Sequence, residues 1–181
     1  AKFAADVQFE GLLHAKVLRS KVAHGILKEV NISKAQALPG VVAVLTGLDV
    51  PGPNSTGIII KDEPVLVKPD QKIRKIGDPI ALVAAETEEI AEKALELIEV
   101  NVEAVRKIRK GDADKAFGEC VVIVEQSYKT QMTEHAYIEP EAGVAKYDGE
   151  ILTMWVSTQN PHYDAKEVAR NLNIGLNKVR V

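Results

Sequence analysis

The sequence has only one cysteine, Cys120, among its 181 residues. A single thiol cannot form an intrachain disulfide, and by itself it cannot hold an iron–sulfur cluster, which takes several thiolate ligands. We therefore expect a reducing compartment, with the cytoplasm as the default. Because Cys120 directly precedes the apolar run 121–124, packing in a strand is favoured over a role as a catalytic thiol.

Long hydrophobic runs are also missing. No apolar stretch approaches the ~20 residues that cross a bilayer, and the N-terminus has no basic region followed by an apolar core. The net charge of −3 arises from interspersed signs, so we expect neither nucleic acid nor a membrane as a partner. The one basic cluster, 106–110, contains no aromatic residue and is interpreted as a solvated face or linker rather than a phosphate site.

Several common catalytic patterns are absent. There is no phosphate loop, no Gly-x-Gly-x-x-Gly and no Ser-His-Asp elbow, which leaves hydrolase, nucleotide-triphosphatase and Rossmann functions without support. The four histidines lack the short spacing of zinc motifs, so a metal site is not expected. Glu134, Glu139 and Glu141 could form a carboxylate cluster, but hydrogen bonds to the backbone or to neighbouring side chains are favoured over an acid–base pair.

Periodicity predicts an α+β fold with enough apolar content, 46%, for one large domain or two small ones. In the first region, Ser33 and Thr87 are expected to cap helices, and the apolar face of the second helix is expected to be core. An irregular excursion over 49–70 should contain a brief strand at 58–60. The strands expected from short apolar or alternating runs are 11–18, 23–31, 41–45, 80–85 and 100–103.

The second region should begin near Ala104. Asp112 is expected to cap a short helix ahead of a long strand over 121–130. Asp148-Gly149, between alternating runs, predicts a β-hairpin with a two-residue turn. A helix should begin near Pro161 and end at Asn173 and Gly175, and 179–181 should begin another strand.

Two polar runs fall where strands would otherwise continue, and they point to a family. They are Glu134-His135-Ala136-Tyr137-Ile138-Glu139 and Ser157-Thr158-Gln159, and upstream lie the runs 13–20, 37–46 and 77–84. In this order the motifs resemble the large, molybdenum-binding subunit of the xanthine dehydrogenase and aldehyde oxidase family, and the resemblance covers nearly the whole chain. It implies an α/β hammerhead domain at 1–103, a mixed β-sheet with packed helices. Residues 104–181 would then be the incomplete start of the molybdopterin-binding domain, its first β-hairpin and helix.

The resemblance also implies a chemistry. Members of the family are oxidoreductases that hydroxylate an aldehyde or an N-heterocycle with water as the oxygen source, and electrons leave through iron–sulfur clusters to a flavin. By resemblance, Gln159 is both the catalytic and the cofactor-binding residue, hydrogen-bonded to an oxygen ligand of the molybdenum. An amide suits this role because it donates and accepts hydrogen bonds without itself ligating a metal. From its residues alone, Gln159 would be interpreted as an ordinary polar group at a strand end.

The chain departs from the family pattern in two ways. Only 104–107 separate two segments that a longer, proline-containing linker usually joins, and the family's Phe-Gly-Gly loop and general-base glutamate do not occur. The resemblance therefore implies a fragment whose partners are the remainder of the subunit, iron–sulfur and FAD subunits or domains, and a small-molecule substrate. Separate subunits are favoured by analogy with bacterial members. Molybdopterin would bind the full-length subunit but not this fragment, and adding molybdopterin and an aldehyde to the purified chain should give no hydroxylation.

Two alternatives stay open at this point. One is a non-catalytic hammerhead-type scaffold or partner-binding module, which would equally lack the loop and the base. The other is a small-molecule-binding α+β domain unrelated to molybdenum. The second is favoured only if the Gln159 end of the hairpin is buried among apolar side chains.

Overall fold

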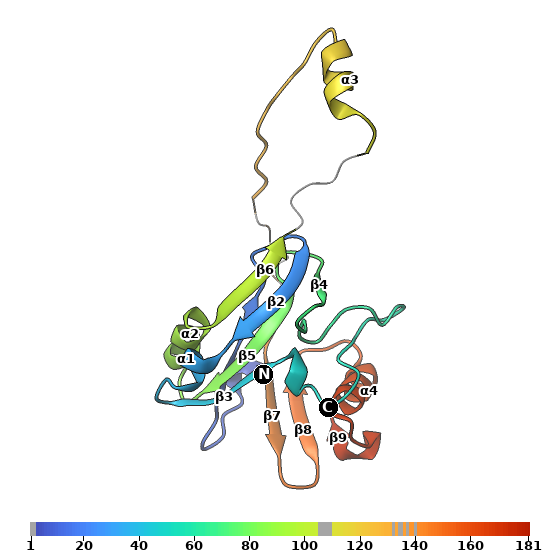
Figure 1. Ribbon diagram of the computed structural model, residues 1–181. Helices are drawn as coiled ribbons and strands as arrows, with labels where there is room; N and C mark the ends of the chain where they lie inside the picture. Colours follow the sequence, from blue (N-terminus) through green and yellow to red (C-terminus); the bar gives the residue numbers. More distant parts are fainter. Residues whose placement is uncertain (1–2, 105–109, 132, 134–135, 137, 140) are drawn as a thin grey trace.

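Separate strands of the first hundred residues form two antiparallel sheets. The computed structural model describes residues 3–104, 110–131, 133, 136, 138–139 and 141–181. One sheet has the order β1-β5-β3 and the other β4-β2-β6 (Figure 1). The bounds are β1 His14–Arg19, β2 Gly25–Asn31, β3 Val41–Thr46, β4 Lys72–Ile73, β5 Pro79–Ala85 and β6 Glu99–Ala104. The four strand pairings are antiparallel, and β1, β2 and β3 each carry one irregularity in register.

Helices α1 (Ser33–Gln36) and α2 (Glu88–Glu96) pack on the β1-β5-β3 sheet. The predicted cap of α2 is confirmed, because the hydroxyl of Thr87 accepts a hydrogen bond from the backbone N–H of Ile90 at 3.3 Å. The predicted apolar face is confirmed too: Ala91, Ala94 and Ile98 are buried against this sheet. The predicted cap of α1 is wrong, since Ser33 is the first helical residue and the residue before it makes no side-chain cap.

A second group of buried residues, Leu27, Val67, Ile73 and Ile80, fills the space beside the β4-β2-β6 sheet. The long connection around it departs from the prediction. The expected strand at 58–60 is wrong: these residues form a bend, and Ile59 is 93% exposed. High β-propensity does not suffice here, because the apolar triplet has no neighbouring strand among the described residues with which to pair.

The third sheet has the order β7-β8-β9, with β7 Gly143–Tyr147, β8 Leu152–Val156 and β9 Val179–Arg180. The predicted hairpin is confirmed, but its loop is the four residues 148–151 rather than two. The cause is the carboxylate of Asp148, which accepts hydrogen bonds from the backbone N–H groups of Glu150 and Ile151. Strand β9 runs parallel to β8, and α4 (Pro161–Leu172) connects the two.

The N-terminal segment also packs on this hairpin. The one-turn helix η1 (Ala4–Asp6) contacts β7, and the rings of Phe9 and Trp155 lie 5.1 Å apart. Lys146 lies on β7 of the same sheet, and its ammonium group is 5.0 Å from the centre of the Phe9 ring. Residues from the two ends of the chain thus share one small apolar surface.

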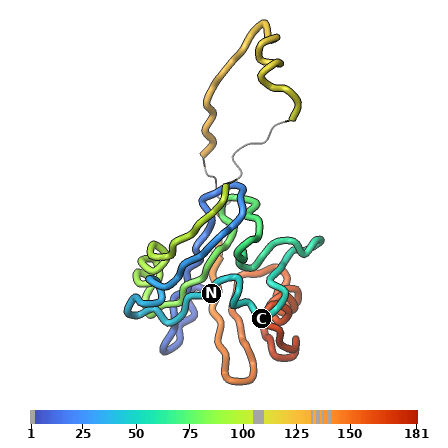
Figure 2. Tube along the Cα trace, viewed as in Figure 1, coloured from blue at the N-terminus to red at the C-terminus, as the bar shows by residue number. Residues whose placement is uncertain are grey.

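An extension containing α3 (Ala113–Glu119) projects from the body of the protein (Figures 1 and 2). Asp112 caps this helix as predicted, by accepting a hydrogen bond from the N–H of Lys115. The predicted strand at 121–130 is wrong, because these residues join no ladder among the described residues. Packing of Cys120 in a strand is wrong as well, since the residue is exposed at the end of α3. Of the basic cluster 106–110, only the exposed Lys110 lies within the described residues.

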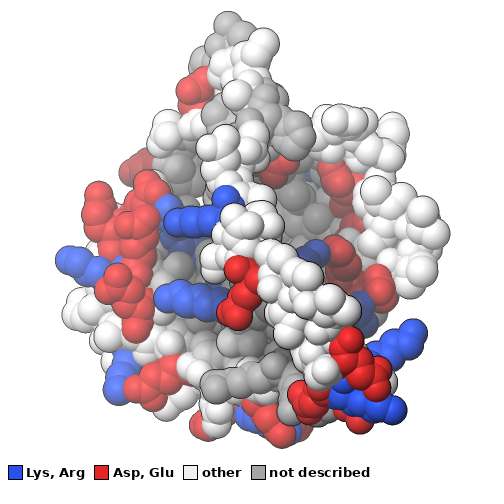
Figure 3. All heavy atoms as spheres, turned by 90° about the horizontal axis from the view of Figure 1, so that it is seen from above, with Lys and Arg blue, Asp and Glu red and all other residues white. Residues whose placement is uncertain are grey.

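Surface charges are interspersed, and on the face drawn in Figure 3 acidic and basic side chains lie next to one another. Several of them pair across elements, including Lys28 with Glu103 and Lys178 with Glu150. No helix formed by the described residues is long and apolar enough to cross a bilayer.

A polar clamp joins the loop 51–63 to α4; its residues are Ser55, Lys61, Glu167, Arg170 and Asn171. The ammonium group of Lys61 donates to the carboxylate of Glu167 at 2.7 Å, and the guanidinium of Arg170 donates to the same carboxylate at 2.9 Å. The side-chain amide of Asn171 donates to the carbonyl of Ser55 and accepts from its N–H. Arg170 donates to the carbonyl of Ser55 as well.

Glu167 is the buried centre of the clamp, with 8% of its surface exposed. Burial alone would raise the pKa of its carboxyl group, but the hydrogen bonds from Lys61 and Arg170 outweigh burial and hold the pKa below its ordinary value. The hydrogen bond to Glu167, and a second one to Tyr163, raise the pKa of Lys61. The charged forms of both groups are therefore favoured by folding.

The Leu27→Ala variant should have a free energy of unfolding about 2–5 kcal/mol below that of the wild type. The side chain of Leu27 is 0% exposed, and its truncation leaves a cavity beside β4. Urea denaturation measures this change. Leu48→Ala, at a position 69% exposed, is the control and should change stability by less than about 0.5 kcal/mol. Equal losses in the two variants would contradict the assigned core.

The Glu167→Gln variant should melt at a lower temperature than the wild type at neutral pH, and the gap should narrow in acid. A lowered pKa means that the stabilisation is present above the ordinary carboxyl pKa and is lost as the pH falls through the folded-state value. Melting curves between pH 3 and pH 7 would measure the gap. Glu150→Gln, which breaks a surface pair with Lys178, is the control with little change at any pH. A gap independent of pH would show that the Glu167 charge contributes nothing.

Candidate functional site

The bend at residues 157–160 connects β8 to α4 and carries the candidate residue. Proline at the first position of α4 suits a helix start, because its missing N–H would have no partner there. Asn160 caps the helix, with its side-chain oxygen accepting from the N–H of Tyr163 at 3.2 Å. The hydroxyl of Thr158 accepts from the N–H of Asn160 at 3.0 Å and itself donates to the carboxylate of Asp164. The bend is thus tied to the first turn of α4.

Gln159 lies at the apex of this bend and is exposed. Within the described part of the chain its side-chain amide has no hydrogen-bond partner, in contrast to its neighbours Thr158 and Asn160. It is not buried among apolar side chains, so the condition that favoured a domain unrelated to molybdenum is not met. An exposed, unpaired amide next to the positive end of a helix is free to bond a ligand oxygen.

The other polar run contributes one described residue to this neighbourhood. The carboxylate of Glu139, half-buried, accepts a hydrogen bond from the backbone N–H of Ala4 at 3.2 Å. This is the backbone role that the sequence favoured for the glutamates. Glu141 is exposed, and Glu134, His135 and Tyr137 lie outside the described residues.

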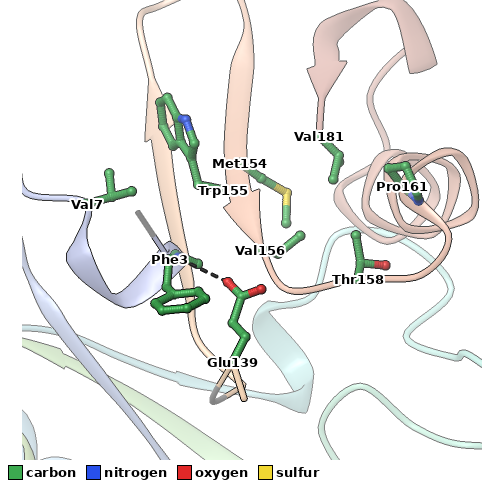
Figure 4. Close-up of a pocket in the computed structure, with 10 residues that line it drawn as sticks. Phe3, Val7, Glu139, Met154, Trp155, Val156, Thr158, Pro161 and Val181 are labelled. Carbon is green, nitrogen blue, oxygen red and sulfur yellow. Dashed lines mark hydrogen bonds between the residues drawn. The ribbon is translucent and has the colours of Figure 1, made fainter. Parts of the chain in front are cut away.

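A cavity of about 510 Å³ opens beside the bend, between η1, β8 and the start of α4 (Figure 4). Glu139 and Thr158 supply its polar side chains. Most of its lining is apolar: Phe3, Ala4, Val7, Met154, Trp155, Val156, Pro161 and Val181. Gln159 does not line the cavity, but Thr158 and Pro161 on either side of it do.

The site can orient a ligand by hydrogen bonds. No group of three or more histidine, cysteine, aspartate or glutamate residues that could hold a metal ion occurs among the described residues. Two features were missed by the sequence: the polar clamp on α4 and the N-terminal segment on the hairpin. A signal for the first was present, since Tyr163, Glu167 and Arg170 recur at helical spacing and form a polar face where an apolar one is usual.

Two family models match this chain. The model described as the a/b hammerhead domain of aldehyde oxidase and xanthine dehydrogenase matches residues 1–106, and the model of a molybdopterin cofactor-binding domain matches residues 96–181.

Curated relatives agree. The chain is 43% identical over 208 residues to the nicotinate dehydrogenase large molybdopterin subunit of Eubacterium barkeri, covering 100% of this chain and 48% of that protein. It is 36% identical over 207 residues to a probable xanthine dehydrogenase subunit of Bacillus subtilis (strain 168), covering 99% of this chain and 28% of that protein. The chain therefore spans about half or less of the length of these relatives.

Solved structures share the fold. The aldehyde oxidoreductase of Desulfovibrio desulfuricans ATCC 27774 is similar with a TM-score of 0.74 at 27% identity, over 99% of this chain and 24% of that one. Quinoline 2-oxidoreductase of Pseudomonas putida 86 is similar with a TM-score of 0.73 at 25% identity, over 98% and 27% respectively. Through the family model that matches more than half of its residues, and with relatives along its whole length, the chain belongs to the aldehyde oxidase and xanthine dehydrogenase family and contains its hammerhead domain.

Proposed function

We propose that this chain forms part of the molybdenum-binding subunit of an oxidoreductase that hydroxylates an aldehyde or an aromatic N-heterocycle. The observation that carries the proposal is the exposed amide of Gln159, which has no hydrogen-bond partner among the residues that the structure describes. It lies on the bend between β8 and α4, at a position that the family motif assigns to the cofactor. Membership in the family supports it, as do relatives whose names include nicotinate dehydrogenase and xanthine dehydrogenase. The lone exposed Cys120 fits a cytoplasmic location.

The residues of the bend fit a molybdopterin group. When bound in the complete subunit, this cofactor supplies the redox chemistry that inserts oxygen from water into an electron-poor carbon. Gln159 would donate or accept a hydrogen bond at an oxygen ligand of the metal, without coordinating the metal itself. By this proposal the isolated chain neither retains the cofactor nor turns over substrate.

The hammerhead domain would end near Ala104, where β6 ends, and the cofactor-binding domain would begin there. Its exposed extension supports the need for further chain. Val121, Val122, Ile123 and Val124 are 57–99% exposed in an extended segment whose main-chain groups have no ladder partner among the described residues. Four consecutive apolar residues in water are unfavourable by about 25 cal/mol per Å². We infer that the remainder of the subunit covers them, with iron–sulfur and FAD subunits or domains completing the electron path.

In the complete enzyme, the backbone amides of residues 121–128 should exchange hydrogen at least about tenfold more slowly than in this chain alone, because pairing with a covering segment would protect them. Exchange followed by mass spectrometry measures the difference. The amides of β5, already paired on both sides, serve as the internal reference that should not change. Equal exchange of 121–128 in the two samples would mean that this segment stays uncovered in the complete enzyme.

Replacement of Gln159 tests the proposed site. In the complete enzyme, Gln159→Ala should lower kcat/KM for nicotinate, xanthine or benzaldehyde, whichever the wild type oxidises, by about 10- to 100-fold. Molybdenum content should remain that of the wild type, because the amide does not ligate the metal. Gln36→Ala, at an exposed glutamine of α1, is the matched control and should be unchanged. If the two variants behave alike, Gln159 has no role at the cofactor.

A further inference from the structure

The direction in which the side chain of Gln159 points depends on the position of the first turn of α4 relative to β8. One end of its bend is fixed by β8, which is paired with β7 and β9. The other end is fixed by the first turn of α4, through the bonds of Thr158 with Asp164 and of Asn160 with Tyr163. Any displacement of this first turn relative to β8 therefore moves the amide of Gln159.

Tyr163 connects that first turn to a distant loop. Its backbone N–H is capped by Asn160, while its hydroxyl donates to the carbonyl of Gly57 at 2.9 Å. The same hydroxyl accepts a hydrogen bond from the ammonium group of Lys61 at 2.9 Å, and that group also lies 4.7 Å from the centre of the Tyr163 ring. One residue thus bonds the bend through its backbone and the loop 51–63 through its side chain.

The acceptor on the loop lies next to an antiparallel bridge, in which the backbone groups of Thr56 and Glu63 exchange hydrogen bonds. Gly57 has a φ of +136°, and a Cβ atom at this position would lie 1.9 Å from the carbonyl oxygen of Ile60. Only glycine fits this tight turn. The carbonyl of Gly57 belongs to this turn, and the hydrogen bond from Tyr163 ties the first turn of α4 to it.

We propose that Tyr163 is a positioning residue for Gln159, acting through the first turn of α4 and the bend at 157–160. The proposal rests on the proposed function, in which Gln159 contacts an oxygen ligand of the cofactor. The polar clamp holds α4 further along, at Glu167, Arg170 and Asn171, so the helix stays docked without the Tyr163 hydroxyl. Removal of that hydroxyl then releases the start of α4 and leaves the rest of the helix in place.

The test compares Tyr163→Phe, Tyr147→Phe and Gln159→Ala in the complete enzyme. Tyr147 is the matched control, because its hydroxyl also donates to a backbone carbonyl, that of Gly149 at 2.7 Å, but at the far end of the hairpin. Tyr163→Phe should lower kcat/KM about tenfold through loss of alignment, and it should shift the electron paramagnetic resonance signal of Mo(V), recorded per molybdenum, in the direction that Gln159→Ala shifts it. Tyr147→Phe should leave both as in the wild type.

The outcomes separate the two proposals. If Gln159→Ala leaves the Mo(V) signal and kcat/KM unchanged, the proposed function fails. If Gln159→Ala changes them but Tyr163→Phe matches Tyr147→Phe, the positioning role is overturned while the proposed function stands. Should Tyr163→Phe not fold, Asp164→Asn weakens the tie between Thr158 and α4, and a shifted signal supports control of Gln159 by the start of α4. An unchanged signal in that variant overturns it.

Discussion

The buried carboxylate of Glu167 is the constraint on which the arrangement of the chain depends. A charge removed from water is unfavourable unless cations and donors replace its hydration. One of its partners, Lys61, belongs to a loop of the first region, and the other, Arg170, lies one helical turn away on α4. If α4 separated from the loop, the carboxylate of Glu167 would lose the ion pair with Lys61. This pairing holds the part of α4 beyond its first turn against the loop.

Much of the fold could be predicted where the signal is local. Thr87 and Asp112 cap their helices as expected, because capping needs only a side chain and the N–H groups two or three residues later. The hairpin and α4 were also predicted, although the four-residue loop was not, since Asp148 closes a wider turn through its own carboxylate. The strands predicted at 58–60 and 121–130 failed for another reason. Apolar, β-branched residues favour extended backbone, but a ladder also needs a partner.

In the candidate site too, local features could be predicted from the sequence and long-range contacts could not. The end of β8 and the start of α4 follow from residues 157–161, so the location of the bend was predictable. The role of Gln159 comes from resemblance, because nothing in its immediate neighbours distinguishes it from any polar residue at a strand end. The polar face of α4 gave a signal for one side of the polar clamp, but its partners on the loop 51–63 were not predictable, since they are separated from α4 by more than one hundred residues along the chain.

The bare stretch 121–124 has a consequence for how this protein can be produced. Short, uncharged, β-branched segments with open main-chain groups pair readily with copies of themselves, and such pairing leads to insoluble assemblies. Its neighbours Glu119 and Glu125 place a negative charge on each side, which slows self-pairing by mutual repulsion.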